Sequence, residues 1–162
     1  MIISVVIIIA VLFWDDIKTL LSKFKNTDKM STVKFKSNTN NPFNIKANKA
    51  NNWQGKNTKE GATFESFDSI EYGIRAGIKL LSTYFNKYKL NTIEKIIPRY
   101  APPSENDTAG YIDFVSSETG FQSDQPIDWT KENIWKLSHA LCKMENGYNL
   151  NREDYETAWQ LL

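Results

Sequence analysis

Cysteine and histidine are almost absent from this chain. Its 162 residues include one cysteine, Cys142, and one histidine, His139. A single cysteine excludes an internal disulfide, and these two residues cannot supply the several ligands of a typical zinc site. We expect Cys142 to be a small core residue and His139 to lie on the surface, because the two face different sides of one predicted helix.

Strong charge and phosphate-binding loops are absent as well. The formal net charge is +1, which gives no support for binding of nucleic acid by the whole chain. The sequence has no glycine-rich phosphate loop and no internal repeat. We therefore predict no cofactor, no metal and no nucleic-acid partner. The length suits a single folded domain after an N-terminal segment.

One long apolar run is present, at the N-terminus. Ile2–Trp14 is almost continuously apolar, and Asp15 and Asp16 follow it. The absence of basic residues before the run and of a small-residue cleavage site after it argues against a signal peptide. A buried core element is an alternative. The run is shorter than the roughly 20 residues of an ideal membrane span, but apolar residues as far as Phe24 extend it.

We predict a membrane anchor from this run. Lysines follow it, and by the positive-inside rule they would keep the rest of the chain on the cytoplasmic side. The next stretch is polar, rich in lysine and typical of a flexible tether. The predicted organisation is an anchor over residues 1–25, a tether over residues 26–37 and a folded domain over residues 38–162.

The folded domain is predicted to be of the α+β class and predominantly α-helical. Short extended pieces around a loop are expected near residues 53–67, and amphipathic helices are expected after them. The first of these helices is expected to carry an apolar stripe from Ile70 to Tyr88. Capping residues predict where these helices begin. The expected starts are at Ser69, Asn91, Asp107 or Thr108, Thr130 and Asn151, and the helix that starts at Asn91 is expected to end before Pro98.

Glu145 occupies an unexpected position in the predicted helix Thr130–Gly147. At about 100° per residue, it falls on the same apolar face as Leu141 and Cys142. An acid that continues a core stripe loses contact with water, and this loss favours the protonated form that a general acid needs. The alternative is a solvated glutamate at a frayed helix end, which is the commoner situation on helix geometry alone.

Three other acids are candidates for chemistry. Glu105 precedes a predicted helix start, where the helix dipole favours a carboxylate that acts as a base or stabiliser, or one that supports the helix cap. Glu118 lies in the sequence Glu-Thr-Gly, which is an ordinary ending for a helix. Glu65 is expected to face solvent from an extended piece, and it is kept as a minor candidate for a second acid.

Aromatic and amide side chains point to a sugar ligand. Aromatic rings stack on the apolar faces of sugars, and amides bridge sugar hydroxyls. Aromatic residues in or beside predicted loops could alternatively anchor those loops to the core. The candidate substrate-binding residues are Trp53, Tyr100, Tyr111, Asn41, Asn44 and Asn106.

Four blocks of sequence stand out by their order and spacing. They are Asn40–Lys46 with Trp53-x-Gly55, Phe64-x-x-Phe67 with Glu71–Ala76, Ile96–Tyr111, and Leu137–Gly147. Together they resemble the phage virion-associated muralytic enzymes, which are peptidoglycan-degrading lysins with a lytic-transglycosylase-like (lysozyme-like) fold. The resemblance covers nearly all of residues 38–162 and leaves out the anchor.

The resemblance implies a lysozyme-like fold and cleavage of the bond between N-acetylmuramic acid and N-acetylglucosamine. In ordinary lysozyme-like enzymes the acid ends a helix in a Glu-x-Gly context and the β excursion follows it. Here Glu145-Asn146-Gly147 comes late and the excursion comes early. We infer a circularly permuted order, with the helix end beside Asn41–Trp53. Phe43 stands where the family has glycine, so a turn with positive φ would be strained or different there.

The resemblance also implies roles and partners. Glu145 would be the catalytic acid and Glu105 its first candidate partner, with peptidoglycan glycan strands as substrate. A lipid membrane, bound through residues 2–25, and other virion proteins would be further partners, which places the protein in the virion membrane or the host inner membrane. One alternative is a non-catalytic, membrane-anchored virion structural protein that binds peptidoglycan. Cleavage of the stem peptide is another, and the lack of a nucleophile or metal set argues against it.

Overall fold

The computed structural model describes residues 39–162, which belong to one compact unit of the chain, Lys34–Leu162. Within residues 39–162 the regular elements are helices only, so the predominantly α-helical prediction is confirmed. The predicted extended pieces are reduced to two isolated antiparallel bridges, Lys46–Phe64 and Lys56–Phe67. The helices are α2 (Ile70–Asn86), α3 (Ile93–Tyr100), α4 (Thr108–Thr119), α5 (Lys131–Asn146) and α6 (Arg152–Gln160).

The predicted anchor, residues 1–25, and the predicted tether, residues 26–37, lie outside the described residues. Within residues 39–162, no helix is both long enough and apolar enough to cross a membrane.

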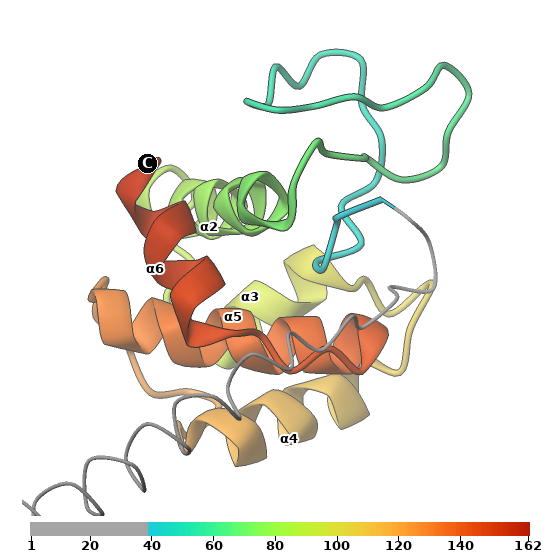
Figure 1. Ribbon diagram of the computed structural model, residues 1–162. Coiled ribbons are helices and arrows are strands. Elements are labelled where there is room, and N and C mark those ends of the chain that lie inside the picture. Colours follow the sequence, from blue (N-terminus) through green and yellow to red (C-terminus); the bar gives the residue numbers. More distant parts are fainter. Residues whose placement is uncertain (1–38) are drawn as a thin grey trace, which may run out of the picture. The chain divides into compact units, whose positions relative to one another are not determined.

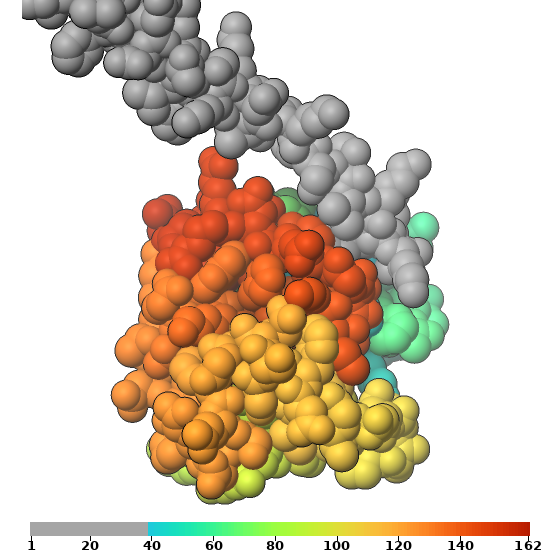
Figure 2. All heavy atoms as spheres, turned by 90° about the horizontal axis from the view of Figure 1, so that it is seen from below, coloured from blue at the N-terminus to red at the C-terminus, as the bar shows by residue number. Residues whose placement is uncertain are grey.

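Helix α5 lies at the centre of the helical arrangement (Figure 1). Helix α4 packs against α5 and α3, while α2 pairs with α6 and also contacts α5 (Figure 1). Figure 2 shows the face that α4 covers, in gold, with the later helices in orange and red beside it. The apolar face of α5 carries Ile134, Leu137 and Leu141, all of which are buried. This packing fixes the C-terminal end of α5, where Glu145 lies.

Three of the predicted helix caps are confirmed by side-chain hydrogen bonds, whereas Ser69 precedes α2 without a cap bond from its side chain. The Thr130 hydroxyl accepts a hydrogen bond from the Asn133 amide at the start of α5, and the Asn151 side chain accepts one from Glu153 at the start of α6. Asp107, rather than Thr108, caps α4. Gly147 ends α5 with φ 64°, the left-handed conformation that suits glycine.

Three helix boundaries differ from the prediction. The N-cap of α3 is Thr92 rather than Asn91. Helix α3 does not end before Pro98 but runs through it to Tyr100. Proline removes the hydrogen bond to the carbonyl four residues earlier, and that residue, Glu94, is exposed, so water can satisfy its carbonyl. Tyr88 does not continue the apolar stripe of α2, because the helix ends at Asn86 and Tyr88 is 42% exposed.

The irregular segment before α2, residues 39–69, packs closely against that helix at two of the helix's glycines. A Cβ at Gly77 would lie 2.2 Å from the ring of Phe43, and one at Gly73 would lie 1.8 Å from the carbonyl oxygen of Asn40. Phe43 is therefore a core residue. The turn differs from a glycine-type turn at Phe43, because the positive φ, 47°, is at Asn44. Asparagine tolerates this region, so the chain avoids strain at Phe43.

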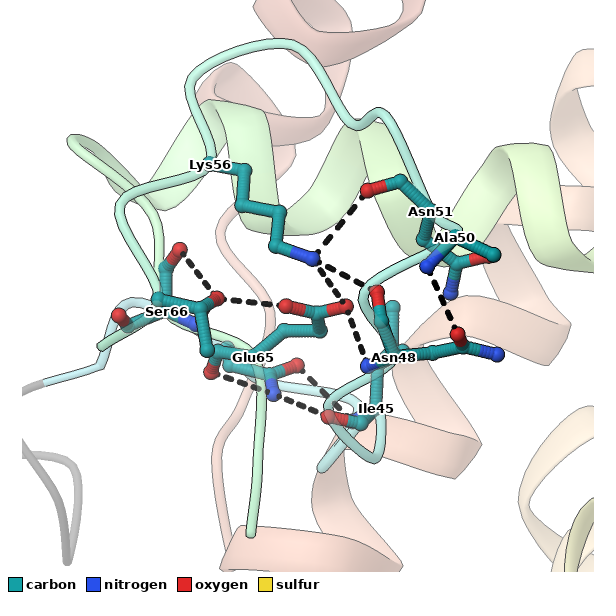
Figure 3. A network of polar contacts seen from close by, with 9 residues as sticks. Ile45, Asn48, Ala50, Asn51, Lys56, Glu65 and Ser66 are labelled. Carbon is teal, nitrogen blue, oxygen red and sulfur yellow. Dashed lines mark hydrogen bonds and ion pairs between the residues drawn. The ribbon is translucent and has the colours of Figure 1, made fainter. Parts of the chain in front are cut away.

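The prediction that Glu65 faces solvent is wrong. Its side chain is fully buried, at 0% exposure. One carboxylate oxygen accepts hydrogen bonds from Lys56 Nζ at 3.0 Å and from the Asn48 amide at 3.1 Å, and the other accepts one from the Thr58 hydroxyl (Figure 3). Glu65 is two residues from buried Phe67, and residues two apart in extended chain face the same side. The network ties residues 48–58 to residues 65–67.

Candidate active site

A cleft of about 530 Å³ is formed by the irregular segment, α2 through Leu80 and Tyr84, the end of α3 with the loop after it, and the end of α5. It is open to solvent and combines acidic, amide and aromatic side chains. Five of the predicted site residues line it, and they come from three separate parts of the chain. They are Asn44, Tyr100, Glu105, Asn106 and Glu145.

The carboxyl group of Glu145 is held from both sides. Glu145 Oε1 accepts a hydrogen bond from the Tyr111 hydroxyl at 2.8 Å, and Oε2 accepts one from Asn44 Nδ2 at 2.9 Å. The same Asn44 amide donates to the Glu145 carbonyl at 3.2 Å, and Asn146 Nδ2 donates to the carbonyl of Pro42 at 2.8 Å. The end of α5 therefore meets the Asn41–Trp53 segment as predicted. Glu145 is half-buried rather than freely solvated.

Tyr111 lies on the first turn of α4, beside the α3–α4 loop, and it is 3% exposed. It reaches the site through its hydroxyl, which donates to Glu145, and it is not among the residues that line the cleft. Burial and the neighbouring Glu145 carboxylate raise the pKa of Tyr111 far above its ordinary value. The phenol therefore stays protonated and remains a hydrogen-bond donor.

Tyr100 packs edge-on against Tyr111, with ring centroids 6.2 Å apart. Its hydroxyl donates to the carbonyl of Phe43 at 2.5 Å, and burial raises the pKa of Tyr100 well above its ordinary value. Tyr100 thus lines the cleft and also ties the end of α3 to the segment that carries Asn44. The anchoring alternative for Tyr100 is confirmed by this hydrogen bond, and its sugar-stacking role stays a prediction.

Glu105 is on the rim of the same cleft, in the loop before α4. Its carboxylate forms an ion pair with Lys46, at 2.5 Å, and its side chain is 53% exposed. The pair joins the α3–α4 loop to the irregular segment. Asn106, beside Glu105, is also exposed and donates weakly to the Pro102 carbonyl, at 3.4 Å. Of the four acids considered from sequence, Glu105 and Glu145 share this cleft.

Asn41 and Trp53 do not line the cleft. Asn41 is 2% exposed, and its side chain accepts from the Ile45 amide at 3.1 Å and donates to the carbonyls of Ile45 and Glu65, each at 3.0 Å. These bonds shape the turn that presents Asn44. Trp53 is half-buried and packs against the core. The predicted sugar-binding role of both residues is replaced by a structural one.

The remaining sequence candidates lie outside the cleft. Glu118 forms an ion pair with Lys143 at 2.7 Å. Cys142 is a buried core residue, as predicted, and burial followed by the charge of Glu145 raises the pKa of its thiol. His139 is half-buried, and its ring lies 5.4 Å from that of Trp135. Within residues 39–162, no three His, Cys, Asp or Glu residues are placed to hold a metal ion.

The sequence reasoning missed several residues that line the cleft. Asn48 and Asn51 add two amides, Phe64 adds a partly exposed aromatic ring, and Arg99 adds a guanidinium. The spacing of Asn44, Asn48 and Asn51 along one short segment is the signal that could have indicated the amides. Arg99 adjoins Tyr100, but nothing in its local sequence marks it as part of a cleft.

Comparison with known proteins gives one informative result. No protein-family model matches the chain. A protein of Pseudoalteromonas phage PM2, named Protein P5, is 42% identical to it over 113 residues, which are 68% of this chain and 69% of that protein. At this identity and coverage, the chain belongs to the same family as Protein P5 of phage PM2.

Proposed function

We propose that this protein cleaves the glycosidic bond between N-acetylmuramic acid and N-acetylglucosamine in bacterial peptidoglycan. The observation that carries the proposal is the carboxyl group of Glu145, held by Tyr111 and Asn44 in an open cleft of about 530 Å³. Cleavage of a glycosidic bond needs a carboxylic acid that is fixed beside the leaving oxygen. The resemblance of the four sequence blocks to those of muralytic enzymes supports the same activity.

The walls of the cleft suit an amino-sugar polymer. Four asparagines line the cleft, namely Asn44, Asn48, Asn51 and Asn106. Primary amides both donate and accept hydrogen bonds, so they match hydroxyl and acetamido groups. The Phe64 ring is 40% exposed and offers an apolar surface on which a sugar ring can stack.

In the proposed reaction, Glu145 donates its proton to the glycosidic oxygen as the bond to the muramic acid carbon breaks. The Glu145 carboxylate then accepts a proton from the incoming hydroxyl. That hydroxyl is either the 6-hydroxyl of the same muramic acid, which closes an anhydro ring, or a water molecule, which leaves a reducing end. The first route needs one acid, and the second usually needs two.

The position of Glu105 favours the one-acid route. Its carboxylate is engaged with Lys46 at the exposed rim, so it is poorly placed to stabilise positive charge at the reacting carbon. We therefore expect 1,6-anhydromuropeptides as the main product. Mass spectrometry of the soluble products distinguishes them from reducing muropeptides by the loss of one water. A predominance of reducing ends would instead assign Glu105 a direct role.

The finer fold assignment is part of the proposal. A lysozyme-like domain in circularly permuted order is supported by the Glu145-Asn146-Gly147 helix end, which lies against the segment that carries Asn44. An experimental structure with a bound chitin oligomer would test it. The sugar chain should cross the cleft beside Glu145, and a chain bound elsewhere would contradict the assignment.

The setting of the enzyme is proposed from the sequence and the relative. Membership of the family of a phage protein supports a role in phage entry or exit. Residues 2–25 would hold the protein on the virion membrane or the host inner membrane, where other virion proteins could contact it. Flotation of the full chain with phospholipid vesicles, compared with a chain that begins at residue 38, tests the anchor. Equal flotation of both would contradict it.

Replacing Glu145 tests the catalytic assignment. Glu145→Gln keeps the size of the side chain and removes the proton donor, so we expect clearing of purified cell walls to fall by at least about 100-fold with an unchanged circular dichroism spectrum. Glu118→Gln is the matched control, because Glu118 also lies near a helix end but outside the cleft.

The result also separates the catalytic proposal from its alternative. Clearing by Glu145→Gln at the rate of the unaltered protein would refute the assignment. If the unaltered protein pellets with cell walls but never clears them, the non-catalytic peptidoglycan-binding protein is the correct description.

A further inference from the structure

Arg99 differs from the other arginines of residues 39–162. Arg75 donates to the carbonyl of Leu161 at 2.8 Å, and Arg152 forms ion pairs with two glutamates. Arg99 has no hydrogen-bond or ion-pair partner within residues 39–162. Its guanidinium lies over the Tyr88 ring, 4.8 Å from the centroid, and it lines the cleft that contains Glu145.

The positive charge of Arg99 is therefore open to a ligand. The other cation among the described residues of the cleft wall is Lys46, and Glu105 already pairs with it. A guanidinium stays charged throughout the working pH range, and its planar fork matches a carboxylate with two parallel hydrogen bonds. The aromatic platform of Tyr88 limits the orientations of the guanidinium, which lowers the entropy lost when it binds.

We propose that Arg99 binds a carboxylate of the substrate and makes the enzyme selective for carboxylate-bearing glycan strands over neutral amino-sugar polymers. This inference rests on the proposed function, because it assigns a substrate group to the same cleft. Peptidoglycan offers carboxylates from two sources, the stem peptide and the lactyl group of muramic acid where the peptide has been removed. Chitin has the same sugar backbone without either source.

The test compares three variants of the full chain. Arg99→Met removes the charge and keeps the length of the side chain, while Arg99→Lys keeps the charge and loses the fork. Lys95→Met is the matched control, because Lys95 is an exposed cation on the same helix and does not line the cleft. Thermal unfolding of each variant checks that the fold is retained.

Three polymers distinguish the sources of the carboxylate. They are intact peptidoglycan, glycan strands stripped of stem peptides by an amidase, and soluble chitin oligomers. Initial rates give kcat and KM on the first two. Affinity for all three is measured in a Glu145→Gln background, so that none is consumed during the measurement.

We expect Arg99→Met to raise KM for intact peptidoglycan about tenfold with kcat changed less than about twofold. The lost charge-assisted contact would stabilise the bound substrate and the transition state equally, so its removal weakens binding without slowing the chemical step. The KM of Arg99→Lys should fall between those of Arg99→Met and the unaltered protein, and the KM of Lys95→Met should match that of the unaltered protein. Affinity for chitin should not change. An effect on intact peptidoglycan that is lost on stripped strands assigns the stem peptide. An effect that appears only on stripped strands assigns the lactyl carboxylate, because that group is free only after the stem peptide has been removed.

Two results would overturn the inference. One is an unchanged KM of Arg99→Met on both carboxylate-bearing polymers, and the other is an equal loss of affinity for chitin. Failure of the proposed function is distinguishable, because it appears as an absence of cleavage by the unaltered protein. In that case, a preference for peptidoglycan over chitin that depends on Arg99 would still uphold the carboxylate contact.

Discussion

At the scale of single residues, the candidate site depends on two neutral side chains that hold one acid. Tyr111 and Asn44 each bond to one carboxylate oxygen of Glu145. Neither partner carries a charge, so hydrogen bonds rather than ion pairs fix the position of this carboxyl group. Tyr111 is thus a positioning residue, which differs from the sugar-stacking role predicted from its sequence.

Tyr111→Phe isolates this positioning role. The substitution keeps the ring and removes the hydroxyl, so Glu145 loses one hydrogen bond and can rotate away from the leaving oxygen. We expect kcat on peptidoglycan to fall about tenfold, with KM nearly unchanged because Tyr111 does not line the cleft. Tyr72→Phe, on a half-buried tyrosine of α2 outside the cleft, is the control. A kcat equal to that of the control would exclude the positioning role.

At the scale of elements, the irregular segment before α2 is ordered by buried polar contacts rather than by strands. It carries Asn44, Asn48 and Asn51 into the cleft, and the carboxylate of Glu65 fastens it from inside (Figure 3). A buried carboxylate needs a charged partner and hydrogen bonds to offset its loss of water. Lys56 supplies the charge from a position that is 21% exposed.

Glu65→Gln tests the strength of this fastening. The substitution leaves the Lys56 ammonium without its charged partner. Breaking a fully buried pair costs about 3–5 kcal/mol, and the partial exposure of Lys56 reduces this, so we expect the free energy of unfolding to fall by about 2–3 kcal/mol in urea titrations.

Glu60→Gln provides the control for that measurement. Glu60 pairs with Lys49 at 2.6 Å in the same segment, but the two side chains are 85% and 86% exposed. Exposed pairs contribute roughly 0–1 kcal/mol, so this variant should be nearly as stable as the unaltered protein. Equal destabilisation by the two substitutions would show that burial of Glu65 is not what holds the segment.

At the scale of the whole molecule, buried tyrosines make the folded state less stable as the pH rises into the alkaline range. The pKa of five tyrosines is raised above the ordinary 10.0, in each case chiefly by burial, and they are Tyr84, Tyr100, Tyr111, Tyr148 and Tyr155. Above pH 10 the unfolded chain releases these protons while the folded chain keeps them. The folded state then binds more protons, so its stability is complete below pH 10 and falls as pH rises further.

The expected outcome is a Tm that decreases steadily above about pH 10. Lysines also titrate in this range, so the comparison with Tyr111→Phe is the informative one, because that variant lacks one of the five tyrosines. Its Tm should fall less steeply between pH 10 and 11.5 in calorimetric scans. Parallel curves for the two proteins would show that Tyr111 does not contribute to the pH dependence.

Local sequence patterns were sufficient to predict most helices and their caps. Thr130 and Gly147 bound α5 as predicted, and Asn151 caps α6. These features depend on residues within a turn or two of each other, so a single sequence records them. The exceptions are the start of α3, which lies at Thr92 rather than Asn91, and Pro98 and Tyr88, where solvent and the end of a helix override the local pattern.

The sequence by itself determined the helical class, the position of Glu145 on an apolar helix face and the absence of a set of metal ligands rich in histidine or cysteine. Only the tertiary structure decided which polar groups meet. Glu145 bonds to Asn44, 101 residues away, and to Tyr111, 34 residues away, while Asn41 and Glu65 turn inward and Arg99 turns to the cleft. Periodicity reports which side of an element is apolar, but hydrogen-bond partners follow from how distant segments pack.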